Sequence, residues 1–254
     1  MYRPRIIPVL LLKDLGLVKT TKFKDYNYIG DPINAVRIFN DLEADELIFL
    51  DITATNENRT IDFNFIKEIS EEAYMPFSVG GGIRNIEDVK TIISQGAEKI
   101  VLNSSCYNKP NLITEAAELF GSQSVVVSLD IHKNFLGKYH LYSCGGKKKQ
   151  KESIINWAKK VVELGAGEIL INSINNDGSM KGYDLDIIEK VSNNVSVPVV
   201  ACGGAGDYTH FKDAIDVGAH AVSAGSLFVY HGPRKAVLIN YPSREQIKEI
   251  RFND

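Results

Sequence analysis

The sequence predicts an α/β protein of the (βα)8 class, a TIM barrel, built from two half-barrel repeats. Eight short apolar segments alternate with amphipathic stretches along the chain, and an internal repeat relates its two halves. The length of 254 residues suits one such barrel, and no linker or shift in composition divides the chain. We therefore expect a single barrel domain over residues 1–254.

The eight apolar segments are typical of parallel strands that are buried on both faces. They occupy residues 6–12, 47–52, 77–79, 100–102, 125–129, 169–171, 197–201 and 221–224. Seven stretches between them have the apolar spacing of a helix with one buried face. These stretches are 32–42, 63–74, 86–95, 112–120, 153–164, 185–191 and 208–217. Eight buried strands with intervening helices favour a closed barrel over an open sheet.

The internal repeat relates the two halves by a shift of about 122 residues, without a gap. The shift places Glu46-Leu47-Ile48 on Glu168-Ile169-Leu170, Pro76 on Pro198, Gly81-Gly82 on Gly203-Gly204, Gly96-Ala97 on Gly218-Ala219, and Ser104 on Ser226. Each half therefore supplies half of the eight strands.

Composition excludes several classes of protein. Hydrophobic residues make up 44% and charged residues 24%, which is typical of a globular chain. A net charge of −3 does not favour binding to nucleic acid or to an anionic membrane, so any anion-binding site depends on a local group of residues. The apolar run near the N-terminus is too short to span a bilayer and has no signal-peptide cleavage pattern. Three widely spaced cysteines without metal-ligand spacing predict no metal site and a reduced, cytoplasmic protein. We also expect no cofactor.

Two glycine clusters follow predicted strands and precede helices, at equivalent positions of the repeat. Glycine lets the backbone approach an anion, and a helix start offers free N–H groups to phosphate. One such cluster is equally explained as a tight turn, but two related clusters favour a ligand with a phosphate at each end. The candidate residues of the two sites are Gly81, Gly82, Asn103 and Ser104 in the first half, and Gly203, Gly204, Gly225 and Ser226 in the second.

Carboxylates also end predicted strands, on the barrel face where active sites of this fold lie. Asp51 ends the second strand, Asp130 the fifth, and Asp177-Gly178 follows the sixth. Asp130 is the candidate acid or base, and a salt-bridged or capping aspartate is the alternative. We expect Asp177 and Gly178 to contribute to substrate binding.

Four ionisable residues, Arg5, Glu46, Lys99 and Glu168, lie at the starts of strands and should meet in a ring across the opposite end. From these residues alone, the ring is a structural salt-bridge network. The lysine run at 147–151 is interpreted as a solvated loop, or as a segment that reaches toward a phosphate.

Essentially the whole chain resembles the HisF family, the cyclase subunits of imidazole glycerol phosphate synthase. The motifs that carry this resemblance are Arg5-Ile6-Ile7, Lys19, Gly30-Asp31-Pro32, Asp45-Glu46-Leu47, Leu50-Asp51-Ile52-Thr53-Ala54, Gly80-Gly81-Gly82-Ile83, Phe120-Gly121-Ser122-Gln123, Gly165-Ala166-Gly167-Glu168, Asp177-Gly178, Lys181-Gly182-Tyr183-Asp184 and Gly203-Gly204-Ala205-Gly206.

The resemblance implies a barrel docked to a HisH-type glutaminase, which releases ammonia from glutamine. The ammonia crosses the barrel and cleaves a phosphoribulosyl ligand into imidazole glycerol phosphate and an aminoimidazole carboxamide ribonucleotide. It also implies that the ring is an ammonia gate, that Gln123 lies at the glutaminase interface, and that Lys19 belongs to a mobile first loop. The glycine clusters match the two phosphate sites of the family.

One departure from the family concerns its acid–base pair, which is two aspartates at the ends of the first and fifth strands. This chain has Asp130, but Leu11 stands in the place of the other aspartate, and leucine cannot transfer a proton. Asn172 and Cys202 also alter the mouth.

The first loop and the residues after Ser226 resemble a HisF-like paralogue of surface-polysaccharide gene clusters. This resemblance implies that the barrel and its glutaminase supply ammonia to a separate sugar amidotransferase that makes acetamidino groups. The alternatives are a genuine cyclase of histidine biosynthesis and a non-catalytic conduit or scaffold that activates the glutaminase.

Overall fold

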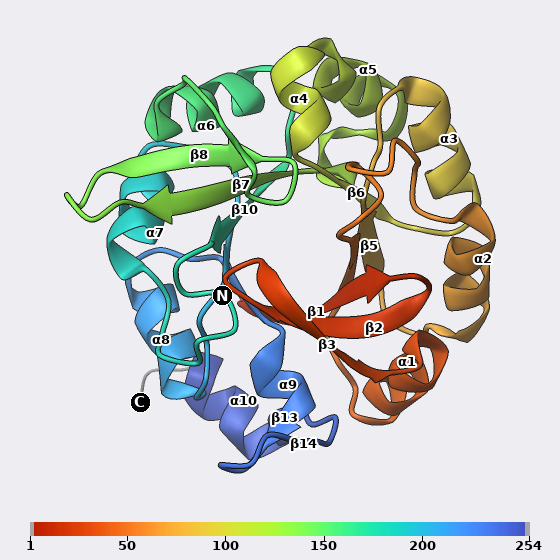
Figure 1. Cartoon of the computed structure of the whole chain (residues 1–254), viewed down its shortest axis with the longest axis vertical. Helices are drawn as coiled ribbons and strands as arrows, with labels where there is room; N and C mark the ends of the chain where they lie inside the picture. Colours follow the sequence, from red (N-terminus) through yellow and green to blue (C-terminus); the bar gives the residue numbers. More distant parts are fainter. Residues whose placement is uncertain (1–2, 252–254) are drawn as a thin grey trace.

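Eight parallel strands close into a barrel in this structure, a computed structural model that describes residues 3–251. The strands are β1 (Arg5–Lys13), β4 (Leu47–Asp51), β5 (Phe77–Gly80), β6 (Lys99–Leu102), β7 (Val125–Lys133), β10 (Glu168–Ser173), β11 (Val199–Cys202) and β12 (Ala221–Ala224). Each pairs in parallel with its neighbours, and β1 closes the ring by pairing with both β4 and β12 (Figure 1). The predicted (βα)8 barrel is confirmed, and all eight predicted strands lie where expected.

Helices surround the barrel wall (Figure 1). They are α1 (Pro32–Asp41), α2 (Phe63–Glu72), α3 (Ile86–Ser94), α4 (Ser104–Asn108), α5 (Asn111–Phe120), α6 (Ile154–Glu163), α7 (Leu185–Ser192), α8 (Thr209–Asp216), α9 (Ser226–Val229) and α10 (Arg244–Arg251), with a short 3-10 turn at Ser122–Ser124. Four helices begin at a residue whose side chain accepts a hydrogen bond from an amide of the first turn, namely Asp31, Asp62, Asn85 and Ser153. The seven predicted helices are present.

The repeat is visible in the elements. After the shift, β5 coincides with β11 and β6 with β12 in both bounds, and the short helices α4 and α9 begin at equivalent residues. Gly81 and Gly203 both have positive φ, at +132° and +87°. Two equivalent half-barrels therefore place equivalent turns on opposite sides of one mouth.

Two hairpins extend beyond the barrel on the face where the strands end. After β1, β2 (Gly16–Thr21) and β3 (Lys24–Gly30) form an antiparallel pair that crosses the front of the barrel (Figure 1). After β7, β8 (Tyr139–Ser143) folds back antiparallel to it and pairs with β9 (Lys148–Lys149). A small ribbon of β13 (Tyr230–His231) and β14 (Ala236–Val237) follows α9.

The barrel has an apolar interior that is separate from the core between strands and helices. Seven of the barrel strands contribute to it, through Ile7, Val9, Ile48, Val101, Val126, Leu170, Val200, Cys202 and Ala221. Side chains alternate along a strand, so residues two positions earlier and two positions later also face the axis. Four such residues on the earlier side are ionisable, and those on the later side line the mouth. Between residues 3 and 251, no helix is long and apolar enough to cross a membrane.

Candidate functional site

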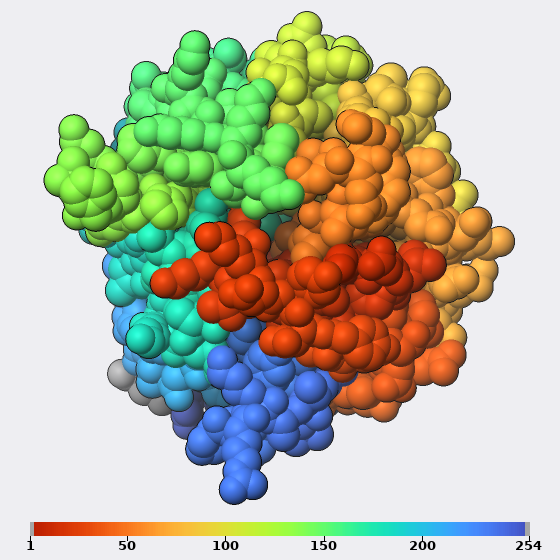
Figure 2. Space-filling view, viewed as in Figure 1, coloured from red at the N-terminus to blue at the C-terminus, as the bar shows by residue number. Residues whose placement is uncertain are grey.

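A cavity of about 660 Å³ opens at the mouth formed by the ends of the barrel strands. Figure 2 shows a hollow near its centre, where the segments around β2, the β4–α2 loop and the β8–β9 turn meet. Every residue predicted to bind substrate or to act as acid or base lines this cavity. These residues are Lys19, Gly81, Gly82, Asn103, Ser104, Asp130, Asp177, Gly178, Gly203, Gly204, Gly225 and Ser226.

Asp130 is the buried acid of the mouth, with 8% of its surface exposed. Ser128 Oγ donates to its Oδ1 at 3.1 Å. Burial raises the pKa of Asp130 to about 7, the hydrogen bond from Ser128 lowers it, and the charge of Asp177 raises it further. A carboxyl group with this pKa can both give and take a proton near neutrality.

Leu11 lines the same cavity from β1, half-buried and packed on the apolar interior. Asp14, the next carboxylate along the chain, does not line the cavity; its Oδ2 lies 3.8 Å from Lys13 Nζ. Asp14 therefore does not replace the missing acid, and among the described residues Asp130 has no second carboxylate on β1 to work with.

Asn172 and Cys202 extend the mouth beside Asp130. Asn172 pairs in register with Asp130 on one side and Cys202 on the other. Asn172 Oδ1 is buried and has no hydrogen-bond partner in the described chain. Burial raises the pKa of the Cys202 thiol to about 12, so this thiol stays protonated and is no nucleophile.

Lys19 lies on β2 but is 3% exposed, because the hairpin folds its side chain into the mouth. Its Nζ donates to the carbonyl of Val9 at 2.5 Å. A Cβ added to Gly225 would lie 2.6 Å from that nitrogen, so the ammonium sits against the second glycine cluster. Burial lowers the pKa of Lys19 to about 8, and the charge of Asp177 partly offsets this.

The glycines of both clusters allow close approach of backbone to backbone. A Cβ on Gly82 would lie 1.9 Å from the carbonyl oxygen of Arg59, and one on Gly204 would lie 2.1 Å from that of Gly182. Both residues have positive φ. Any larger residue would push these turns apart, which explains glycine at both positions in structural terms.

Asp177 and Gly178 hold the β2–β3 hairpin against the mouth. Thr20 Oγ1 and the amide of Phe23 donate to Asp177 Oδ2 at 2.8 and 3.1 Å. A Cβ on Gly178 would lie 2.2 Å from the Thr20 carbonyl oxygen. Burial raises the pKa of Asp177, against these hydrogen bonds and the charge of Lys19. The Asp177 carboxylate thus anchors the hairpin that carries Lys19.

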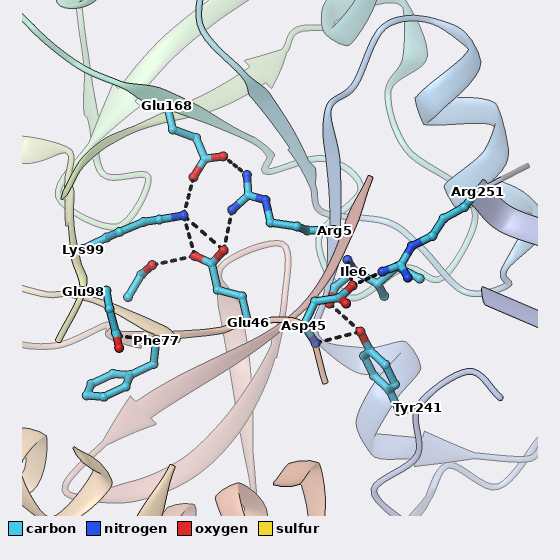
Figure 3. A network of polar contacts seen from close by, with 11 residues as sticks. Arg5, Ile6, Asp45, Glu46, Phe77, Glu98, Lys99, Glu168, Tyr241 and Arg251 are labelled. Atoms are coloured by element: carbon cyan, nitrogen blue, oxygen red, sulfur yellow. Dashed lines mark hydrogen bonds and ion pairs between the residues drawn. The ribbon is translucent and has the colours of Figure 1, made fainter. Parts of the chain in front are cut away.

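At the opposite end, the four predicted residues do form a ring (Figure 3). The Arg5 guanidinium bridges Glu46 and Glu168. Lys99 Nζ lies 2.9 Å from Glu46 Oε1 and 3.2 Å from Glu168 Oε2. Burial lowers the pKa of Arg5, but the charges and hydrogen bonds of the two glutamates outweigh it and leave the pKa above its ordinary value. Alternating charges close the floor of the barrel.

A second network beside the ring was not predicted. Arg251 pairs with Asp45, and its Nε donates to the carbonyl of Pro4 at 2.9 Å. Asp45 Oδ2 accepts from the amide of Ile6 at 2.8 Å, and Tyr241 Oη donates to the carbonyl of Ile6 at 2.8 Å. These contacts fix the backbone on both sides of Arg5 (Figure 3). Sequence gives little signal for the contacts of Arg251 and Tyr241, because more than 200 residues separate them from their partners: 206 for Asp45, 235 for Ile6 and 247 for Pro4.

Gln123 lies in the 3-10 turn that precedes β7, and its side chain is exposed. Because the turn enters β7 at its start, Gln123 lies at the same end of the barrel as the ring. Among residues 3–251, no group of three or more His, Cys, Asp or Glu side chains could hold a metal ion.

Fold and site together define a (βα)8-barrel protein with a cavity lined by two glycine clusters at one end and a ring of charged side chains at the other. Residues 5–233 match the model of a family described as "Histidine biosynthesis protein", and the chain belongs to this family. Within it, the chain is a HisF-like subunit of the imidazole glycerol phosphate synthase type.

Three relatives illustrate this relationship. A provisionally assigned imidazole glycerol phosphate synthase subunit hisF2 of Pseudomonas aeruginosa is 49% identical over 95% of this chain and 97% of its own length. A provisionally assigned HisF subunit of Leptospira interrogans is 49% identical over 99% and 100%. The imidazole glycerol phosphate synthase subunit HisF of Alkaliphilus metalliredigens is 45% identical over 91% and 92%.

Proposed function

We propose that this chain is the ammonia-handling barrel of a glutamine amidotransferase. A HisH-type glutaminase docks on the ring face as the second subunit of a heterodimer and releases ammonia there. The ammonia passes the gate of Arg5, Glu46, Lys99 and Glu168, crosses the barrel and leaves at the mouth. Gln123, exposed at the ring end, contributes to the glutaminase interface.

The order of layers along the axis supports this path. Glu46, just before β4, and Ile48 and Leu50 on β4 face the axis in turn, at the ring, the apolar interior and the mouth. The interior layer is uncharged, so it favours neutral ammonia over ammonium. Because Lys99 is a single ammonium on a flexible stem, it can leave the ring while Arg5 still bridges both glutamates.

The mouth binds a small ligand with two phosphates, one at each glycine cluster. Both clusters line the cavity at repeat-equivalent positions, and Lys19 lies at the second. Backbone amides and serine hydroxyls provide the hydrogen bonds, and helix starts supply little here because α4 and α9 are short.

One observation, Leu11 at the mouth, favours a role in ammonia supply over a role as a cyclase. The chain has the ring and both glycine clusters, but Leu11 stands where the family has one aspartate of its acid–base pair. We infer that the chain supplies ammonia to a separate sugar amidotransferase that makes acetamidino groups for surface polysaccharide. Similarity to a subunit designated hisF2 is compatible with a second, specialised copy.

The alternative is a cyclase of histidine biosynthesis, and the pKa of Asp130 near 7 favours it, because this group remains fit for proton transfer. A passive scaffold is less well supported, since a protein that binds no ligand would not need two glycine clusters suited to phosphate.

A steady-state assay of the purified chain with ammonium and the phosphoribulosyl substrate separates the two enzymes. A turnover two or more orders of magnitude below that of an ordinary cyclase, roughly the loss of one acid–base group, supports the ammonia-supplying role. Turnover equal to an ordinary cyclase assayed beside it contradicts that role.

A further inference from the structure

The turn between β8 and β9, residues 144–147, contacts Ser104 at the first glycine cluster. The amide of Cys144 donates to Ser104 Oγ at 2.9 Å. A Cβ on Gly145 would lie 3.8 Å from Asn56 Nδ2, and one on Gly146 would lie 3.2 Å from Phe23 Cδ2. The turn therefore touches the first cluster, the β4–α2 loop and the β2–β3 hairpin, and Figure 2 shows these three segments meeting around the hollow.

The backbone of this turn is fixed in an uncommon shape. Cys144, Gly145 and Gly146 have φ values of +54°, +64° and +78° in succession. A left-handed conformation costs a residue other than glycine roughly 1–2 kcal/mol, so Cys144 holds it only because its surroundings require it. The contacts to the three neighbouring segments stabilise this conformation, and they fix the position of the backbone at Lys147.

Lys147 is the member of the lysine run that faces the mouth. All three lysines are exposed, but Lys147 lines the cavity with Cys144 and Gly145, whereas Lys148 and Lys149 of β9 do not. Within residues 3–251, the Lys147 ammonium has no carboxylate within ion-pair distance. Lys147 is thus exposed to solvent and at the same time lines the cavity, which fits both interpretations of the lysine run.

One lysine contacts the second cluster, and another lies on a turn that contacts the first. Lys19 reaches the second cluster at Gly225, and Lys147 stands on the turn that is hydrogen-bonded to Ser104 of the first. Arg84 also lines the cavity, but its Nη1 donates to the carbonyl of Asn58, so its guanidinium is partly engaged.

We infer that Lys147 is a phosphate-binding residue, which closes over the phosphate monoester at the first cluster as Lys19 does at the second. An ammonium on a flexible stem offers three donors to phosphate oxygens and follows a phosphate as it settles into the turn. This inference rests on the proposed function, since it requires a phosphorylated ligand in the mouth. It adds a specificity for ligands that carry a phosphate at both ends, since one cation serves each end.

Site-resolved binding of inorganic phosphate tests the assignment. Crystals of the wild type and of Lys147→Ala, Lys147→Arg and Lys148→Ala are soaked over a range of phosphate concentrations, and occupancy is refined at each cluster. Lys147→Ala should weaken binding at Gly82 and Ser104 by about tenfold, the lower end for a charge-assisted hydrogen bond, and leave Gly204 and Ser226 unchanged. Lys147→Arg should retain most of the affinity, and Lys148→Ala should match the wild type.

Equal losses in Lys147→Ala and Lys148→Ala would overturn the inference, because they would indicate a diffuse charge effect. An equal loss at both clusters would do the same. Unchanged binding in Lys147→Ala, with normal binding in the wild type, contradicts the inference alone. Wild-type clusters that stay empty at saturating phosphate contradict the phosphorylated ligand of the proposed function as well. Lys147 is exposed, so its substitution leaves the packed core intact.

Discussion

Replacing Leu11 by aspartate should restore part of the cyclase chemistry. Leu11 ends its side chain in the mouth cavity, across the barrel from β7, which carries Asp130. The new carboxylate would therefore face water and ligand instead of the sealed interior. We expect ammonium-dependent cyclisation to rise at least tenfold, which is about 1.4 kcal/mol of activation free energy. One acid–base group contributes roughly 100- to 10,000-fold in well-formed sites, so tenfold allows for imperfect placement.

The cost to stability should be moderate. Leu11 is half-buried and packs beside Leu50, so its loss removes roughly 1 kcal/mol of apolar burial. The two carboxylates would raise each other's pKa, and the pKa of Asp130 already lies near 7. Near neutral pH one of them stays protonated, which is the state that an acid–base pair needs.

The assay compares wild type, Leu11→Asp and Leu11→Asn with ammonium and the phosphoribulosyl substrate. Asparagine has nearly the shape of aspartate but transfers no proton, so Leu11→Asn should stay at the wild-type rate. Equal gains in both variants would refute the proton-transfer argument. A folded Leu11→Asp protein that binds the substrate without gaining activity would show that the whole mouth, with Asn172 and Cys202, has diverged.

Three further outcomes follow from the ring, the buried acid and the first glycine cluster. Lys99→Ala should lower the rate of cyclisation with glutamine as the ammonia source about tenfold and leave the rate with free ammonium nearly intact, because the ring acts only on ammonia that enters from the glutaminase. Equal losses in both assays would contradict the role of the ring as a gate. Asp130→Asn should raise the free energy of unfolding at pH 8 by on the order of 2 kcal/mol and have little effect near pH 4. Burial raises the pKa of Asp130 from its ordinary value of 3.8 to about 7 in the folded chain, so the free energy of unfolding of the wild type falls as pH rises between these two values. Urea titrations at the two pH values measure this, and a pH-independent difference would refute it. Gly82→Ala should lower the free energy of unfolding by about 3 kcal/mol or more, because the new Cβ meets the Arg59 carbonyl. Gly137→Ala, also at positive φ but with nothing within 4 Å of the new Cβ, should lower it by roughly 1 kcal/mol. Equal losses of stability would contradict the close approach at Gly82.

The barrel could be predicted from the sequence because its strands are buried on both faces and therefore appear as uninterrupted apolar runs. The repeat gives independent support, since it aligns the two glycine clusters with each other and with the strands that precede them. The β2–β3 hairpin is not predicted, because β3 reads Lys-Asp-Tyr-Asn-Tyr-Ile-Gly, a polar and exposed strand that no apolar pattern marks. The helix α9 has four residues, which is too short for a helical period.

The mouth could be predicted because residues at the ends of barrel strands converge at one face. The strand-end rule gives position, however, and not contacts. It places Asp177 at the mouth, but the hydrogen bonds from Thr20 and Phe23 depend on a hairpin more than 150 residues away in the chain. The position of Lys147 likewise depends on how the β8–β9 turn packs on three other loops. Long-range packing of this kind leaves little trace in a single sequence.

The central claim is that a glutaminase docks on the ring face and passes ammonia into this barrel. The most direct measurement is the rate of glutamine hydrolysis by the cognate HisH-type glutaminase, with and without the chain. We expect an increase of roughly tenfold or more at a one-to-one ratio, an ordinary size for coupling between two sites, and loss of this increase when Gln123 on the ring face is replaced by a bulky arginine. An unchanged hydrolysis rate at saturating concentrations of the chain would contradict docking of the glutaminase on the ring face.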